Sequence, residues 1–161
     1  MTVNGSGIFS STEKKTYYFF FPFYLSRPQL RFEKLNGVAR CTVGYSGGKE
    51  ADPTYQRIKD YTEALFVEFD PSVVSYEDLV ISWTQMHKPH YKRNCQYRSA
   101  VWYLDEEQKE TAEEVVKGWQ ASAGGGPLFT SVEPATSFYK GEEYHQYFLT
   151  KQGRGNTRWA C

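Results

Sequence analysis

Short runs of apolar residues, separated by polar turns, divide this chain into alternating strands and helices. An aromatic run after Thr16 and several stretches of alternating apolar and polar residues are typical of strands. The strands predicted in this way cover residues 16–23, 38–45, 63–69, 97–104 and 128–132. This order lacks a strict strand-helix-strand rhythm, so the pattern alone predicts only a compact α/β or α+β domain.

Helices are predicted between these strands. Ser26 with Gln29, and Ser75 with Asp78, match the capping box that opens a helix. Residues 105–123 place apolar side chains on one face, and Glu142 marks the start of a last helix. The predicted helices cover residues 26–36, 75–86, 105–123 and 142–151. We expect residues 1–14 to form a flexible arm, 15–151 a single domain and 152–161 a C-terminal tail.

Charge and cysteine content restrict the function classes. The 161 residues include 19 basic and 19 acidic residues, so neither a nucleic acid nor a membrane is an expected partner. The three cysteines are an odd number without metal-ligand spacing, which favours a cytoplasmic location, no metal and no cofactor. The aromatic run from Tyr17 to Phe21 is too short to cross a bilayer, which takes about 20 apolar residues.

Several short segments of this chain match the sequence motifs of one protein family, and they occur in the same order as in that family. They are Val43-Gly44-Tyr45-Ser46-Gly47-Gly48, Pro53-Thr54-Tyr55, Val67-Glu68-Phe69-Asp70-Pro71, Gln96-Tyr97-Arg98-Ser99-Ala100 and Glu142-Glu143-Tyr144-His145-Gln146. The chain resembles the A class of peptide methionine sulfoxide reductases. The resemblance implies an α+β fold, a two-layer sandwich with a mixed β-sheet.

The resemblance fails at the nucleophile of the family. A cysteine at the start of the first helix attacks the sulfoxide sulfur in these enzymes, and counting without gaps places Tyr24 there. A thiolate at a helix N-terminus is an activated nucleophile, whereas a phenol forms no sulfenic acid. Tyr24 could exchange a proton or hydrogen-bond a substrate, or it could simply pack against its neighbours.

The resemblance also implies a polar group that orients the substrate oxygen, formed by Glu63, Tyr55 and Tyr97. With Tyr24, these are the predicted catalytic residues, although each could equally be a packed side chain. The substrate-binding residues expected around them are Phe23, Leu25, Ser26, Tyr61, Tyr91 and Cys95. Cys95 is of interest because it directly precedes Gln96 and Tyr97, although a loop thiol without function is its plain interpretation.

Three functions fit these residues. The first is a non-redox enzyme that uses Glu63 and the tyrosines for acid/base catalysis, a cyclisation or isomerisation of a small, largely apolar, oxygen-bearing substrate. The second is a methionine (S)-sulfoxide reductase with a relocated thiol, in which Cys95 attacks, Cys161 resolves and thioredoxin is the partner. The third is a catalytically inactive relative that binds a ligand. The retained carboxylate and phenols favour the first.

Overall fold

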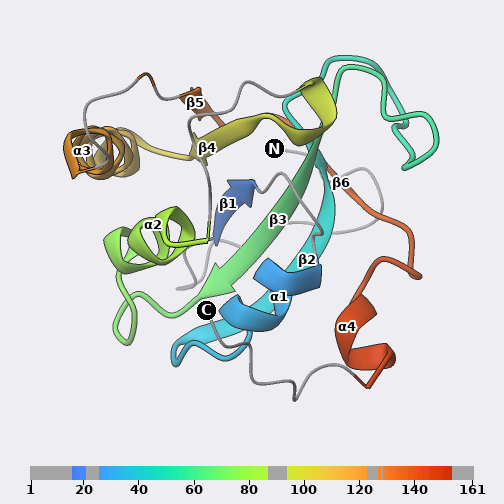
Figure 1. The fold of residues 1–161 in the computed structure, drawn as a ribbon, viewed down its shortest axis with the longest axis horizontal. Coiled ribbons are helices and arrows are strands. Elements are labelled where there is room, and N and C mark those ends of the chain that lie inside the picture. The colour runs from blue at the N-terminus through green and yellow to red at the C-terminus, as the bar shows by residue number, and fades with distance from the viewer. Residues whose placement is uncertain (1–15, 21–25, 87–93, 123–126, 128, 154–161) are drawn as a thin grey trace.

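A six-stranded mixed sheet forms the centre of the protein, as the computed structural model of residues 16–20, 26–86, 94–122, 127 and 129–153 shows (Figure 1). Its strands are β1 (Thr16–Phe20), β2 (Val38–Ser46), β3 (Thr62–Phe69), β4 (Ser99–Tyr103), β5 (Thr130–Pro134) and β6 (Phe138–Lys140), in the order β5-β4-β1-β3-β2-β6. Only β4 and β5, among these strands, pair in parallel. The prediction of an α+β fold with a mixed sheet is confirmed.

Helices complete the described part of the fold, and three of the α-helices pack on the sheet. They are α1 (Ser26–Phe32), α2 (Tyr76–Thr84), α3 (Glu106–Ser122), α4 (Phe148–Lys151) and a short 3-10 helix, η1 (Cys95–Tyr97). The capping box predicted for α2 is present, because the Asp78 backbone N–H donates to Ser75 Oγ at 3.0 Å and the Ser75 N–H donates to the Asp78 carboxylate at 3.3 Å.

The two faces of β3 are both buried. Leu65 and Val67 face a core that includes Trp83 of α2, and all three side chains are fully buried. Ala64 and Phe66, on the alternate positions, face a second, smaller core on the other side of the sheet. Because both faces are covered, β3 is held rigidly, and a residue at its end has a fixed position.

The prediction of a last helix over residues 142–151 is wrong for most of that range. Glu142 does not open a helix: residues 143–147 form turns, and α4 begins only at Phe148. Tyr147 directly before α4 has φ 54, a left-handed conformation that interrupts a right-handed helix. Gln146 is held instead by Val43, whose N–H donates to the Gln146 side-chain oxygen at 3.0 Å.

Strand β6 was not expected from the sequence. It pairs with the end of β2, and Gly44 permits the close approach, because a Cβ there would lie 2.2 Å from the Tyr139 carbonyl oxygen. The capping role predicted for Gln29 is wrong as well. Its side chain is buried, donates to the Cys41 carbonyl at 3.2 Å and accepts from the Tyr147 N–H at 2.9 Å.

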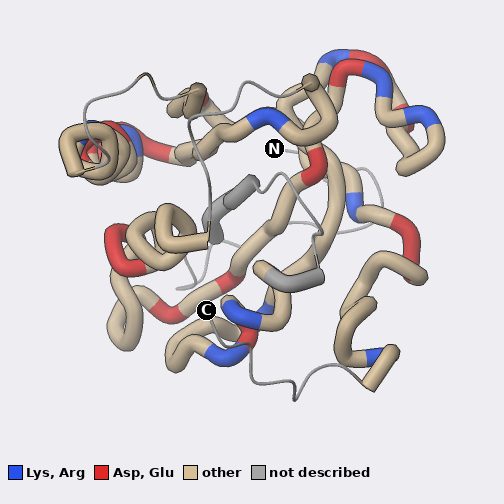
Figure 2. The backbone as a smooth tube through the Cα atoms, in the orientation of Figure 1, with Lys and Arg blue, Asp and Glu red and all other residues tan. Residues whose placement is uncertain are grey.

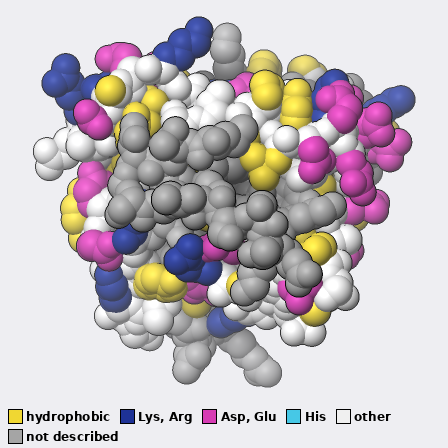
Figure 3. All heavy atoms as spheres, turned by 180° about the vertical axis from the view of Figure 1, so that it is seen from behind, with side chains coloured by type: hydrophobic (Ala, Val, Ile, Leu, Met, Phe, Trp, Pro, Cys, Tyr) yellow, Lys and Arg dark blue, Asp and Glu magenta, His cyan; other side chains and the backbone are white. Residues whose placement is uncertain are grey.

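Charges of both signs are spread along the backbone, with no basic stretch dominating (Figure 2). Acidic side chains gather over α3 (Figure 3), where Glu106, Glu107, Glu110, Glu113 and Glu114 are exposed. None of the described helices is long and apolar enough to cross a membrane. The predicted arm at residues 1–14 lies outside the described residues, as do residues 154–161 of the predicted tail, so both stay predictions.

Candidate active site

Glu63 is a buried carboxyl group near the start of β3. It is only 3% exposed and lies opposite Tyr45 in the neighbouring strand β2. Burial raises the pKa of Glu63 to about 7, although hydrogen bonds from Gln96 and Tyr97 act in the opposite direction. Because this pKa lies close to neutral, a protonated Glu63 is available near pH 7 to donate a proton to a substrate oxygen.

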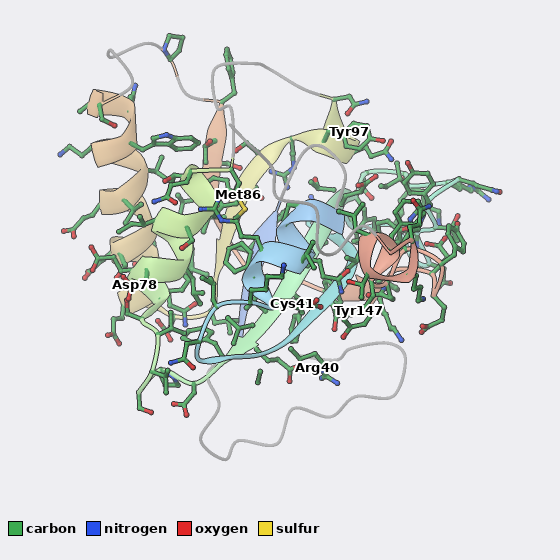
Figure 4. All side chains as sticks on the ribbon, turned by 60° about the horizontal axis from the view of Figure 1, so that its bottom comes forward. Arg40, Cys41, Asp78, Met86, Tyr97 and Tyr147 are labelled. Carbon is green, nitrogen blue, oxygen red and sulfur yellow. The ribbon has the colours of Figure 1, made fainter. Side chains whose placement is uncertain are left out.

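Helix η1 supplies the partners of this carboxyl group. The Gln96 side-chain amide donates to Glu63 Oε1 at 2.8 Å, and the Tyr97 hydroxyl hydrogen-bonds the same carboxyl group. The helix is anchored on β3, because Thr62 Oγ1 donates to the Cys95 carbonyl at 2.9 Å. Figure 4 shows Tyr97 at the end of the molecule opposite Arg40. Gln96 was not a predicted site residue, although its position directly before Tyr97 could have indicated it.

Tyr55 extends the group toward the surface. Its hydroxyl hydrogen-bonds that of Tyr97, and the Tyr97 pKa is raised by burial first and by this hydrogen bond second. Tyr55 is 38% exposed, so this end of the row lies at the protein surface. The structure thus brings Glu63, Tyr97 and Tyr55 together in one hydrogen-bonded row, and their catalytic roles stay predictions.

A second carboxylate, Glu142, positions Tyr55 in this row through a hydrogen bond. It accepts hydrogen bonds from the Tyr45 hydroxyl at 2.5 Å and from the Tyr55 backbone N–H at 2.9 Å. Burial opposes its ionisation, but these hydrogen bonds outweigh burial and lower the Glu142 pKa. No local signal in the sequence could have revealed this role, because Tyr55 and Glu142 are 87 residues apart.

His145 lies between two tyrosine rings beside this carboxylate. The ring centroids of His145 and Tyr55 are 4.3 Å apart, and those of His145 and Tyr144 are also 4.3 Å apart. Burial lowers the His145 pKa, and the nearby Glu142 only partly offsets this effect. The imidazole is therefore neutral at pH 7 and forms part of an aromatic surface that begins at Tyr55.

The two described thiols have opposite surroundings. Cys41 is buried in the main core, and burial raises its pKa far above the usual range. Cys95 is exposed at the start of η1, where its Sγ donates to the Asp60 carbonyl at 2.9 Å. Because Cys95 is exposed and Cys41 is buried, only Cys95 of these two thiols is accessible to a substrate. Cys95 also directly precedes Gln96, the partner of Glu63.

The remaining predicted residues are not part of the described row. Tyr61 is buried, with its ring edge on Tyr139 and its hydroxyl 3.5 Å from Ser137 Oγ, so substrate binding by Tyr61 stays a prediction. Four other predicted residues, Phe23, Tyr24, Leu25 and Tyr91, lie outside the described part of the chain. Ser26 is described only as the first residue of α1.

Comparison with known proteins decides the family. The sequence profile described as "Peptide methionine sulfoxide reductase" matches residues 28–160. The peptide methionine sulfoxide reductase MsrA of Nitrobacter winogradskyi is 39% identical over 136 residues, covering 80% of this chain and 76% of that protein. The chain belongs to the peptide methionine sulfoxide reductase family. The profile match begins after Tyr24, so the similarity rests on the body of the domain.

Solved structures give the same fold for this peptide methionine sulfoxide reductase family member. Methionine sulfoxide reductase A of Corynebacterium diphtheriae superposes with a TM-score of 0.78 at 28% identity, covering 93% of this chain and 82% of that one. Reduced Mxr1 from Saccharomyces cerevisiae gives a TM-score of 0.79 at 24% identity, covering 96% and 92%. A further structure shows Mxr1 in complex with Trx2, with a TM-score of 0.59 at 16% identity over 89% and 91% of the chains.

These relatives overturn one expectation from the sequence. The non-redox cyclase or isomerase predicted above is wrong, because relatives of about this similarity are named as sulfoxide reductases. That prediction gave the residue at position 24 more weight than the rest of the domain. The acid/base roles predicted for Glu63 and Tyr97 are compatible with a reductase as well, since sulfoxide reduction also needs a proton at the substrate oxygen.

Proposed function

We propose that this protein is a peptide methionine (S)-sulfoxide reductase. The observation that carries the proposal is the buried Glu63, whose pKa is raised to about 7 and whose carboxyl group is held by Gln96 and Tyr97. A neutral carboxylic acid at this place can protonate a sulfoxide oxygen as the S–O bond breaks. The phenols of Tyr97 and Tyr55 add donors for the charge that develops on that oxygen.

Cys95 is the thiol that we assign as nucleophile. It is exposed, whereas Cys41 is buried and has a raised pKa. Its place is fixed by two contacts with the segment that leads into β3: Sγ donates to the Asp60 carbonyl at 2.9 Å, and the Cys95 carbonyl accepts from Thr62 Oγ1 at 2.9 Å. Cys95 is therefore joined to Thr62, the residue before the acid in sequence, and directly precedes Gln96, which holds the acid.

The reaction balances with one thiol in the first step. The Cys95 thiolate attacks the sulfoxide sulfur and forms an S–S bond while Glu63 protonates the oxygen. The oxygen then moves to the Cys95 sulfur as the S–O bond and the new S–S bond break, so that Cys95 becomes a sulfenic acid and methionine leaves as the sulfide. The sulfur of the substrate is reduced by two electrons and that of Cys95 is oxidised by two. Glu63 supplies a proton to the departing oxygen and recovers one from solvent.

A second thiol must then regenerate Cys95. Cys161 would attack the sulfenic sulfur, release water and form a disulfide, which a dithiol protein of the thioredoxin class would reduce. The complex of Mxr1 with Trx2 supports this choice of partner. A reducing cytoplasm is the setting that fits, because free thiols persist there.

The proposal is tested by a methionine sulfoxide reductase assay with a chemical dithiol as reductant. We expect activity in the unmodified protein, its loss in Cys95→Ser, and its retention in the matched control Cys41→Ala. The variant Tyr24→Cys, run beside them, shows whether a thiol at position 24 adds activity. Absence of reduction in the unmodified protein would overturn the proposal, and full activity in Cys95→Ser would overturn the assignment of Cys95.

A further inference from the structure

An aromatic surface leads away from the candidate active site. Tyr144 is 55% exposed, and its ring is tilted by 48° against that of His145, which in turn is tilted by 49° against that of Tyr55. Tyr55 belongs both to this surface and to the row that ends at Glu63. A substrate held at Glu63 therefore has His145 and Tyr144 beside it on the outer side.

Hydrogen bonds hold the backbone of two of these three aromatic residues before any ligand arrives. Glu142 accepts the Tyr55 N–H at 2.9 Å through its carboxylate, and its own backbone carbonyl accepts the His145 N–H at 2.9 Å. One residue thus fixes the backbone of both rings that adjoin the site. Because the backbone at these rings is already held, little conformational entropy is lost at these residues when a ligand binds.

We propose that His145 and Tyr144 form a subsite for a large aromatic side chain that flanks the oxidised methionine in the substrate peptide. The inference rests on the proposed reductase function and adds the sequence context of its substrate. The ring centroids of Tyr55 and Tyr144 each lie 4.3 Å from that of His145. An extended peptide advances about 3.3 Å per residue, so one or two backbone steps together with the length of a large side chain reach Tyr144.

The chemistry of the surface sets the preference. Tyr144 offers an exposed ring, and the His145 pKa is lowered by burial, so the imidazole presents a neutral face. Aromatic side chains gain from offset or edge contacts with such rings. Glu142 is ionised, because its hydrogen bonds lower its pKa. Its negative charge, next to these rings, disfavours an acidic flanking residue in the substrate.

Binding by the full-length protein provides the test. Fluorescence anisotropy would compare labelled methionine sulfoxide peptides that carry Phe, Ala or Asp one or two residues before or after the sulfoxide. The variants are Tyr144→Ala, the conservative Tyr144→Phe, and the control Phe129→Ala. Phe129 is 43% exposed next to β5, at the edge of the sheet opposite β6, so its truncation removes a similar exposed ring at a distant place.

We expect the Phe peptide to bind about 3- to 10-fold more tightly than the Ala peptide at one of these positions, with Asp the weakest. The preference should vanish in Tyr144→Ala and persist in Tyr144→Phe and Phe129→Ala. Equal binding of all peptides, no binding of any, or an unchanged preference in Tyr144→Ala would overturn the inference. A preference without turnover would support the subsite and count against the reductase function alone.

Discussion

The side-chain amide of Gln96 donates a hydrogen bond to the carboxyl group of Glu63 over 2.8 Å. The two residues lie on different elements, since Gln96 is in the centre of η1 and Glu63 is near the start of β3. Burial raises the Glu63 pKa to about 7, and the Gln96 amide limits that rise by stabilising the ionised form. The pair therefore sets the pH range in which a protonated acid is available.

Replacing Glu63 by Gln removes the proton donor while keeping the shape of the side chain. We expect the kcat for sulfoxide reduction to fall by about 10²- to 10⁴-fold, with a much smaller change in KM. The control is Glu68→Gln on the same strand, where the carboxylate pairs with Arg40 at the other end of β3. Steady-state kinetics with a methionine sulfoxide peptide provide the measurement, and a normal kcat in Glu63→Gln would exclude the acid role.

The free energy of unfolding should depend on pH through the same residue. The folded protein binds the Glu63 proton more tightly than the unfolded chain does, because the pKa rises from 4.5 to about 7 on folding. The contribution of Glu63 to the free energy of unfolding is therefore fully present below about pH 4.5. This contribution is lost as the pH rises through about 7.

Urea unfolding at pH 5 and pH 8 measures this effect. Between these two values, the unmodified protein should lose about 2 kcal/mol more than Glu63→Gln, since one pKa unit corresponds to about 1.4 kcal/mol. Identical losses in the two proteins would show that Glu63 is already ionised at pH 5 in the folded state.

Removing the amide partner should shift the titration of the acid. In Gln96→Leu the hydrogen bond that lowers the Glu63 pKa is lost, so the pKa should rise and the high-pH decline of kcat should move to higher pH. Gln85→Leu replaces an exposed glutamine that contacts Arg31 and should leave the profile in place. A pH–rate profile of each variant is the measurement, and a shift to lower pH would contradict the interpretation.

Two adjacent glutamates provide a matched pair of variants. Glu142→Gln weakens the charge-assisted hydrogen bonds to Tyr45 and Tyr55, so we expect a loss of about 1–3 kcal/mol in unfolding free energy and a lower kcat. Glu143→Gln breaks only an exposed ion pair with Lys140, which solvent screens, and should leave the stability nearly unchanged. Chemical denaturation and kinetics on both variants measure the difference, and equal effects would argue against a positioning role for Glu142.

Local patterns were sufficient for most of the fold. The alternation in residues 63–69 predicted β3, and Ser75 with Asp78 correctly predicted the start of α2, because a strand period and a capping box depend only on residues close in sequence. The same patterns failed at Glu142. Its acidic side chain resembles a helix start, yet its partners Tyr45 and Tyr55 come from distant segments.

Periodicity by itself limited the chain to a compact α/β or α+β domain. The ordered motifs gave the resemblance to the family, and this resemblance implied the α+β fold and the group of Glu63, Tyr55 and Tyr97. Only the tertiary structure decided that Glu63 is buried beside Gln96, that Glu142 holds Tyr55, and that Cys95 is exposed while Cys41 is not. The physical reason is that burial and hydrogen bonding depend on which distant segments pack together, and these set the pKa of a carboxyl group and the access to a thiol.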